Sequence, residues 1–429
     1  MEIAELYKIF LSHPEITTDT RLCKSDSIFF ALKGETFNGN KFVSAALNAG
    51  CAYAVTDELT DIDDDRVIRV DNTLLTLQLL ARYHRRAMNI PVVAITGTNG
   101  KTTTKELTAA ALARKYRVLA TEGNLNNHIG VPLTLLKLRD THQIAIIEMG
   151  ASHPGDIREL VEIAEPDFGL ITNVGKAHLQ GFGSFAGVIK TKCELYDYIR
   201  EHSGKIFIRH DDEWLQPASD GVERIEYGEM SGVYVNGRVK DCSPFLSVTV
   251  SKENEEPVDI VTRLIGGYNL YNVLAAVTIA SYFDLNLTDI AGAISDYMPN
   301  NSRSQLIKSN GNDIILDAYN ANPSSMKAAI ENFAVMNVTA KMLILGDMLE
   351  LGDDSRKEHE RVIEMLHSLA FDDVLLVGEE FSECKDNVFC KFVNIEGLMA
   401  YLSKVKPVGK TVLIKGSRGM KLERCLPLL

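Results

Sequence analysis

The stretch of this chain that most constrains its fold is PVVAITGTNGKTTTKEL, at residues 91–107. An apolar run leads into a glycine-containing turn, and a lysine followed by three threonines then opens a helical segment. Glycines let backbone N–H groups approach an anion without interference from Cβ, and a helix N-terminus adds its dipole. The stretch therefore predicts a strand, a phosphate-binding turn and a helix in direct succession.

The glycines of this turn lie closer together than in the common P-loop, G-x-x-x-x-G-K-[ST]. That spacing requires glycine where the chain has Ile95, and the first glycine here is Gly97. Lys101 can neutralise the β- and γ-phosphates of a nucleotide, and a hydroxyl of Thr102 or Thr103 can bind Mg²⁺. The alternative is a strand-to-helix turn without a ligand. Gly-Lys-Thr-Thr directly after an apolar strand favours phosphate binding.

Apolar strands and helical segments alternate over most of the chain, which predicts an α/β fold with parallel sheets and crossover helices. We expect three domains: a small α/β unit at residues 1–88, a central P-loop ATPase domain with a parallel sheet at 89–299, and a Rossmann-like domain at 300–429. TLLTLQLLARYHRRAM, at residues 73–88, is predicted to be a strongly apolar helix that ends in basic residues. Residues 204–262 are predicted to be a β-rich elaboration of the central domain. Within them, Asn236-Gly237 predicts a hairpin turn.

Composition excludes several classes of protein. The 429 residues are 45% hydrophobic and 24% charged, as in soluble globular proteins, and the formal net charge is −13. An acidic chain argues against nucleic acid as the main partner. Seven scattered cysteines, an odd number, favour a reducing, cytoplasmic compartment. No apolar run approaches the ~20 residues of a membrane span. The sequence leaves the oligomeric state open, and a monomer is the working expectation.

Polar side chains follow two of the predicted central strands. Glu148 is the second-last residue of the run QIAIIEM, and His178 lies in a glycine-rich loop after FGLITNV. Ligands bind beyond the carboxyl ends of parallel strands, so both side chains are expected on the same edge as Lys101. Glu148 can bind the Mg²⁺ that bridges nucleotide phosphates. The alternatives are a solvated glutamate and a structural histidine.

Two further helical segments carry polar pairs. Lys190, Lys192 and Glu194 lie on a predicted helix, where a solvated basic face is the plainer interpretation. Asn269 and Asn272 are one helical turn apart, so their amides share a face and can hold a purine edge or a phosphate oxygen.

Three turns of the last domain each follow a predicted strand, at residues 317–326, 345–352 and 415–423. They are expected along one edge of that domain's sheet, where they can form a second substrate wall. Within the first of them, Asn322 followed by Pro323 predicts the N-cap and first position of a helix. The alternative for all three turns is ordinary helix capping, because Asp, Asn and Ser favour N-caps whatever the function.

Together these motifs resemble the Mur ligases, the ATP-dependent amide ligases of peptidoglycan precursor synthesis. The resemblance rests on TGTNGKTT, EMGA, NVGKAHLQGFGS and GYNLYN, and it covers nearly the whole chain. The tight glycine spacing is this family's form of the P-loop. Residues 18–55 and 122–136, with DAYNANPSSM and LGDMLELG, point to the member that joins D-alanyl-D-alanine to UDP-N-acetylmuramoyl-tripeptide through an acyl phosphate.

The resemblance implies a role for each matching residue. The loop residues would bind ATP phosphates: Gly97, Thr98, Asn99, Gly100, Lys101, Thr102 and Thr103. Thr102 and Glu148 would bind one Mg²⁺, and His178 a second. Lys192 falls where most members have a carbamylated lysine. The nucleotide would also contact Asn272, Arg303 and Asp317. Asn126 and Asn127, with the N-terminal domain, would hold the UDP-sugar tripeptide. The dipeptide side would be lined by Tyr319, Asn320, Asn322 and Asp347. Lys101, Glu148, His178 and Lys192 would be the catalytic set.

The chain departs from the family pattern in two places. It has Tyr268-Asn269 where His-Asn is frequent, and Asn301-Ser302-Arg303 where many relatives have Gly-Arg, which makes Arg303 a weaker assignment. The tripeptide's third residue, diaminopimelate or lysine, is left open.

The sequence argues against three other functions. Folylpolyglutamate synthetase belongs to the same superfamily but is expected to lack this N-terminal domain. A P-loop GTPase is expected to carry N-K-x-D or T-K-x-D, and neither occurs. A nucleotide-binding module without catalysis would not need Lys101, Glu148, His178 and Lys192 together.

Overall fold

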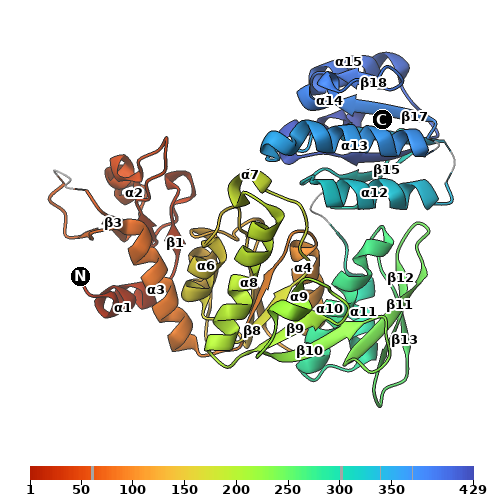
Figure 1. The fold of residues 1–429 in the computed structure, drawn as a ribbon. Helices are drawn as coiled ribbons and strands as arrows, with labels where there is room; N and C mark the ends of the chain where they lie inside the picture. Colours follow the sequence, from red (N-terminus) through yellow and green to blue (C-terminus); the bar gives the residue numbers. More distant parts are fainter. Residues whose placement is uncertain (59–61, 300–302, 339, 370) are drawn as a thin grey trace.

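Three sheets, each with its own helices, follow one another along the chain (Figure 1). The computed structural model describes residues 1–58, 62–299, 303–338, 340–369 and 371–429. The expected boundary between the second and third domains, with Asn301 and Ser302, lies outside the described residues. Among those described, no helix is both long and apolar enough to cross a membrane.

The N-terminal sheet is parallel, with strand order β1-β2-β3-β4. Its elements are α1 (Ile3–Ser12), β1 (Ile16–Thr17), η1 (Thr20–Leu22), β2 (Ile28–Phe30), η2 (Gly39–Phe42), α2 (Val43–Asn48), β3 (Tyr53–Thr56) and β4 (Val67–Arg69).

Helix α3 (Thr73–Met88) connects this sheet to the central one and has the bounds predicted from the sequence. Its N-cap, Asn72, accepts a hydrogen bond from the Leu75 N–H at 2.8 Å. Arg85 near its C-terminus donates to Asp167 of the central domain at 2.8 Å. One buried apolar cluster includes side chains of α1, α3 and the central strands, so the first two parts of the chain share a core.

The central sheet has nine strands in the order β13-β12-β11-β10-β9-β8-β5-β7-β6. Strands from β6 to β11 pair in parallel, and β12 and β13 add an antiparallel edge. The strands are β5 (Val92–Thr96), β6 (Val118–Ala120), β7 (Ile144–Glu148), β8 (Phe168–Ile171), β9 (Lys205–Arg209), β10 (Glu223–Gly228), β11 (Val235–Asp241), β12 (Ser247–Lys252) and β13 (Val258–Val261).

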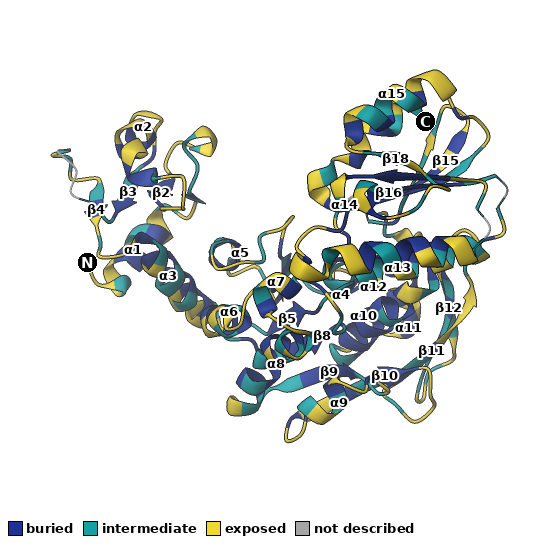
Figure 2. Cartoon of the chain, turned by 45° about the horizontal axis from the view of Figure 1, so that its top comes forward, coloured by how far each residue is buried: buried dark blue, intermediate teal, exposed yellow. Residues whose placement is uncertain are grey.

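Helices cover both faces of this sheet. Alternate residues of β5 point to opposite faces, with Val92 and Ala94 in one core and Val93 and Ile95 in the other. The strands are accordingly buried on both faces (Figure 2). The helices of this part are α4 (Lys101–Leu112), α5 (Gly130–Leu135), α6 (Asp156–Ala164), α7 (Leu179–Phe182), α8 (Phe185–Glu201), α9 (Leu215–Ala218), η3 (Gly267–Asn269), α10 (Leu270–Tyr282) and α11 (Leu287–Asp296).

The predicted hairpin turn at Asn236-Gly237 is wrong, because both residues lie within strand β11. A Cβ on Gly237 would lie 2.7 Å from a methyl carbon of Leu274 on α10. The glycine therefore lets a helix pack closely on the sheet and does not form a turn.

The C-terminal sheet has the order β14-β15-β19-β16-β17-β18, parallel except for the edge strand β14. This arrangement fits the expected Rossmann-like domain. The elements are β14 (Gln305–Ser309), β15 (Asn312–Asp317), α12 (Pro323–Val335), β16 (Lys341–Gly346), η4 (Gly352–Asp354), α13 (Ser355–Ser368), β17 (Asp373–Val377), α14 (Glu379–Glu383), β18 (Cys390–Phe392), α15 (Ile395–Val405), β19 (Thr411–Lys415), η5 (Arg418–Met420) and η6 (Leu422–Leu428).

Candidate active site

A cavity of about 890 Å³ lies where loops of the central and C-terminal domains meet. Its central-domain wall comes from the phosphate-binding turn and from the loops that follow β6, β7 and β8. Its C-terminal wall comes from turns after β15, β16 and β19. Sequence-predicted site residues that line it are Thr98, Asn99, Gly100, Lys101, Thr103, Asn126, Asn127, Glu148, His178, Asn272, Arg303, Asp317, Tyr319, Asn320 and Asn322.

The turn between β5 and α4 requires its glycines. Gly97 and Gly100 have φ of +143° and +82°. A Cβ on Gly97 would lie 2.0 Å from the Thr172 hydroxyl, and one on Gly100 would lie 2.3 Å from the Asn272 amide oxygen. Any side chain at either position would therefore disrupt the turn.

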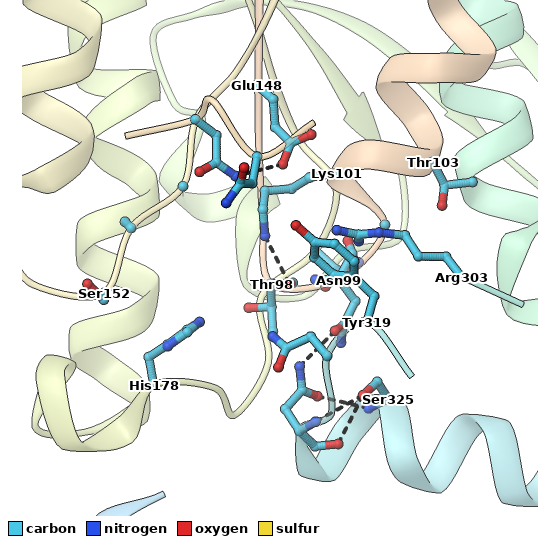
Figure 3. A pocket seen from close by; sticks show the side chains of 18 of the residues that line it. Thr98, Asn99, Lys101, Thr103, Glu148, Ser152, His178, Arg303, Tyr319 and Ser325 are labelled. Carbon is cyan, nitrogen blue, oxygen red and sulfur yellow. Dashed lines mark hydrogen bonds between the residues drawn. The ribbon is translucent and has the colours of Figure 1, made fainter. Parts of the chain in front are cut away.

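Lys101, the first residue of α4, folds back over this turn. Its Nζ donates to the carbonyls of Gly97 at 2.7 Å and Thr98 at 3.1 Å (Figure 3). Burial lowers the pKa of Lys101 to about 8, against the raising effect of Glu148, and the positive charge of Arg303 lowers it further. Carbonyl oxygens are weak partners for an ammonium group, so a phosphate in the cavity would be a better one.

Glu148 at the end of β7 connects the predicted Mg²⁺ subsite to the predicted subsite for the UDP-sugar tripeptide. Its side chain, in a residue only 1% exposed, accepts hydrogen bonds from Thr102 Oγ1 at 2.8 Å and from Asn126 Nδ2 at 2.9 Å. The carboxylate meets only neutral donors there, so its charge lacks a bonded cation within the described parts of the chain.

This arrangement fits one Mg²⁺. No cluster of three or more His, Cys, Asp and Glu side chains suited to a metal occurs in the described residues. Mg²⁺ commonly binds through one or two carboxylates together with substrate phosphates and water, so a full protein cage is not needed. The Thr102 hydroxyl and the Glu148 carboxylate are oxygen donors of the kind that Mg²⁺ prefers.

Asn127, the neighbour of Asn126, has a different role. Its side-chain oxygen accepts hydrogen bonds from the backbone N–H groups of Ile129 and Gly130, at 3.2 and 2.9 Å, where α5 begins. Asn127 thus shapes the loop and leaves only its Nδ2 group for a ligand.

His178 reaches the cavity from the loop before α7, with a left-handed φ of +49°. Its Nδ1 lies 2.5 Å from a carboxylate oxygen of Glu350, a C-terminal-domain residue that also has positive φ, +67°. This ion pair lowers the pKa of Glu350. The predicted convergence of the His178 loop with Lys101 and Glu148 is present, and Glu350 is a cavity residue that sequence reasoning missed.

Lys192 is not on a solvated face. It is 3% exposed on α8, and its Nζ lies 5.7 Å from the centre of the Phe182 ring, whereas Lys190 is exposed. Burial, and then the positive charge of Lys101, lowers the pKa of Lys192 to about 7. The solvated-face interpretation is therefore wrong for Lys192 and right for Lys190.

Asn269 and Asn272 share a face, as predicted, but both are largely occupied by the protein. Asn272 Nδ2 donates to Asn269 Oδ1 at 2.8 Å, and Asn272 Oδ1 accepts from the Thr104 hydroxyl at 3.1 Å. The pair therefore holds the start of α4 against α10 beside the cavity.

The C-terminal domain contacts the phosphate-binding turn directly. Asn322 is the predicted N-cap of α12, and its Nδ2 donates to the Asn99 side-chain oxygen at 2.8 Å. Asp317 at the end of β15 forms an ion pair with buried Lys415 of β19 at 2.6 Å. The hydrogen bond between Asn322 and Asn99 thereby links the two walls of the cavity, which come from separate domains.

Four predicted site residues do not line the cavity: Gly97, Thr102, Lys192 and Asp347. Asp347 is buried, and its carboxylate accepts hydrogen bonds from the Glu380 and Phe381 N–H groups, both at 3.0 Å, at the start of α14. Asp347 thus binds the first turn of a helix that lies far along the chain and whose N-cap is Gly378, which neither the substrate interpretation nor ordinary capping predicted. We do not retain it as a dipeptide-binding residue.

Sequence reasoning also missed Lys415 and Arg418, which both line the cavity. The turn at 415–423 is a predicted part of the substrate wall, but its sequence does not show which of its side chains point inward.

Comparison with known proteins gives consistent results. The chain matches the Mur ligase middle domain at residues 95–280 and the Mur ligase, glutamate ligase domain at 302–418. UDP-N-acetylmuramoyl-tripeptide–D-alanyl-D-alanine ligase of Bacillus subtilis is 34% identical, with 98% of this chain and 96% of the relative covered.

Solved structures agree with this similarity. A crystal structure of MurF from Acinetobacter baumannii superposes with a TM-score of 0.88 at 31% identity, covering 96% of this chain and 93% of that one. MurF ligase from Thermotoga maritima in complex with ADP gives a TM-score of 0.85 at 27% identity, covering 97% of each chain.

Proposed function

The chain belongs to the Mur ligase family, and we propose that it joins D-alanyl-D-alanine to UDP-N-acetylmuramoyl-tripeptide with ATP, in peptidoglycan precursor synthesis. The observation that carries the proposal is the meeting of Lys101, Glu148 and His178 with the C-terminal wall in one cavity. A carboxylate is a poor acyl donor, so phosphorylation by ATP must precede attack by the dipeptide amine.

In this proposal the turn at Gly97–Gly100 and the N-terminus of α4 bind the ATP phosphates through backbone N–H groups. Lys101 moves from its two loop carbonyls to the phosphate oxygens, where its charge stabilises the transferring group. Asn272, Arg303 and Asp317 contact the rest of the nucleotide.

Thr102 and Glu148 are proposed to hold one Mg²⁺, and His178 a second. When bound, Mg²⁺ would neutralise the crowded phosphate oxygens. Asn126 fixes the orientation of the Glu148 carboxylate through their 2.9 Å hydrogen bond. Lys192 is proposed to be carbamylated, because its burial favours the neutral amine that reacts with CO₂.

The contacts between domains suit a reaction whose intermediate hydrolyses. Asn322 with Asn99, and Glu350 with His178, hold the C-terminal domain against the central one. We propose that this closure limits water near the acyl phosphate while Tyr319, Asn320 and Asn322 position the dipeptide. Asn126, Asn127 and the N-terminal domain hold the UDP-sugar tripeptide.

The proposal also covers the oligomeric state of the protein and its cellular compartment. We propose a monomer in the cytoplasm, where its product supports cell shape and division. All seven cysteines are free thiols, which suits a reducing compartment. Sedimentation of the purified chain checks the monomer.

Folylpolyglutamate synthesis is disfavoured by the four-stranded N-terminal domain and by similarity along nearly the whole chain. The deciding experiment measures phosphate release with ATP, UDP-sugar tripeptide and D-alanyl-D-alanine, each omitted in turn. We expect release only with all three and an equal yield of ligated product. Strong release from ATP alone, indifferent to both other substrates, would reject the ligase assignment.

A further inference from the structure

Two arginines lie over the same aromatic ring in the cavity. The guanidinium carbons of Arg303 and Arg418 are 4.0 and 5.1 Å from the centre of the Tyr319 ring. Arg303 and Tyr319 lie beside Asn99 in Figure 3. Stacking on an aromatic face holds a guanidinium in place while its N–H groups remain available for hydrogen bonds.

Other charged groups that line the cavity already have partners. Lys415 pairs with Asp317, and His178 pairs with Glu350. By contrast, Arg303 Nε is buried without a hydrogen-bond partner. Within the described parts of the chain, the Arg418 guanidinium makes no hydrogen bond or ion pair and has only the Tyr319 ring. The cavity thus offers two guanidinium groups to anionic ligands.

The two arginines come from different segments of the C-terminal domain, Arg303 from just before β14 and Arg418 from the turn after β19. Arg303 is close enough to Lys101 for its charge to act on that side chain, which places it toward the phosphate-binding turn. Arg418 is the first residue of η5, on the C-terminal-domain wall after β19, and it lies over the ring of Tyr319, which the function proposed above places on the dipeptide side. An acceptor dipeptide carries a carboxylate at the end opposite its reacting amine.

We propose that Arg418 is the anchor for the C-terminal carboxylate of the acceptor dipeptide, and that Arg303 serves the nucleotide. The proposal rests on the function proposed above. The planar guanidinium suits a two-point hydrogen bond to a carboxylate, and Tyr319 fixes its plane. Holding the carboxylate end directs the amine toward the acyl phosphate and selects a dipeptide with a free C-terminus.

The test compares D-alanyl-D-alanine with its C-terminal primary amide, which keeps the amine and loses the negative charge. In the wild-type enzyme we expect kcat/KM for the dipeptide to exceed that for the amide by roughly 10- to 100-fold, the range for a hydrogen bond to a charged group. Arg418→Ala should reduce this ratio to within about threefold of unity and leave the KM for ATP unchanged.

Lys421→Ala is the matched control, because Lys421 is an exposed cation three residues further along that does not line the cavity. It should keep the wild-type preference. Arg303→Ala should raise the KM for ATP and also keep the preference. Arg418→Gln, checked for folding by its melting temperature, replaces Arg418→Ala if the latter is unstable.

Two results would overturn the proposal. One is that a stably folded Arg418 variant, Arg418→Ala or Arg418→Gln, keeps the wild-type preference for the dipeptide over its amide. The other is loss of the preference in Arg303→Ala instead. Failure of the proposed function is distinguishable, because the wild-type enzyme would then ligate neither the dipeptide nor its amide.

Discussion

Lys192 tests whether burial lowers the pKa of a lysine enough for the amine to be carbamylated. A carbamate forms only from a neutral amine, and an ordinary lysine with a pKa near ~10.4 is neutral in only about 0.04% of molecules at pH 7. Burial and the charge of Lys101 lower the pKa of Lys192 to about 7. About half of the Lys192 side chains are then neutral at pH 7, roughly a thousandfold more.

The perturbation is Lys192→Ala, with Lys190→Ala as the control on the exposed side of the same helix. We expect Lys192→Ala to lose most ligase activity and to recover part of it with formate or acetate, which replace the missing carboxylate-like group. Lys190→Ala should remain close to wild type. Ligated product is measured directly, so ATP hydrolysis without ligation is not counted.

The pH dependence follows from the direction of the shift. As pH falls through about 7, Lys192 gains a proton and the reactive neutral form declines, by about tenfold for each further pH unit. Activity at limiting bicarbonate should therefore fall on the acid side and recover when bicarbonate is added. Labelled bicarbonate should mark Lys192 in wild-type protein.

Two results would refute this reasoning. One is an unmodified Lys192 in fully active protein supplied with CO₂. The other is equal recovery of Lys192→Ala with a neutral amide, since that would show a space-filling role.

Three further predictions concern the rest of the site. Lys101→Ala should fold normally and lose about 10²- to 10³-fold in kcat, because it removes the only cation of the phosphate-binding turn; turnover within a few-fold of wild type would reject its role. Asn126→Ala should raise the Mg²⁺ requirement and the KM for the UDP-sugar tripeptide, because it releases the Glu148 carboxylate. A rise in the KM for ATP alone would show that Asn126 does not belong to the subsite for the UDP-sugar tripeptide. Asp347→Ala should lower the free energy of unfolding by about 1–3 kcal/mol, since two backbone N–H groups at the start of α14 lose their acceptor. Its KM for the dipeptide should stay unchanged, and a large rise would restore the discarded substrate role.

The sequence by itself determined the local features of this protein. Helix α3 could be bounded correctly because Asn72 caps it and its apolar periodicity ends at Met88. Asn322 followed by Pro323 likewise indicates where α12 begins. These features depend on hydrogen bonds and dihedral preferences within a few residues, which any chain with this sequence would share.

The tertiary structure alone decided which polar side chains meet. Lys190 and Lys192 are two residues apart on one helix, yet only Lys192 is buried. Asp317 ends β15 and Asp347 directly follows β16, yet Asp347 binds the start of α14 and Asp317 lines the cavity. Arg418 and Glu350 reach the site only because the C-terminal domain packs against the central one. Burial and convergence of this kind depend on contacts between residues far apart in the chain, and local sequence patterns carry no record of them.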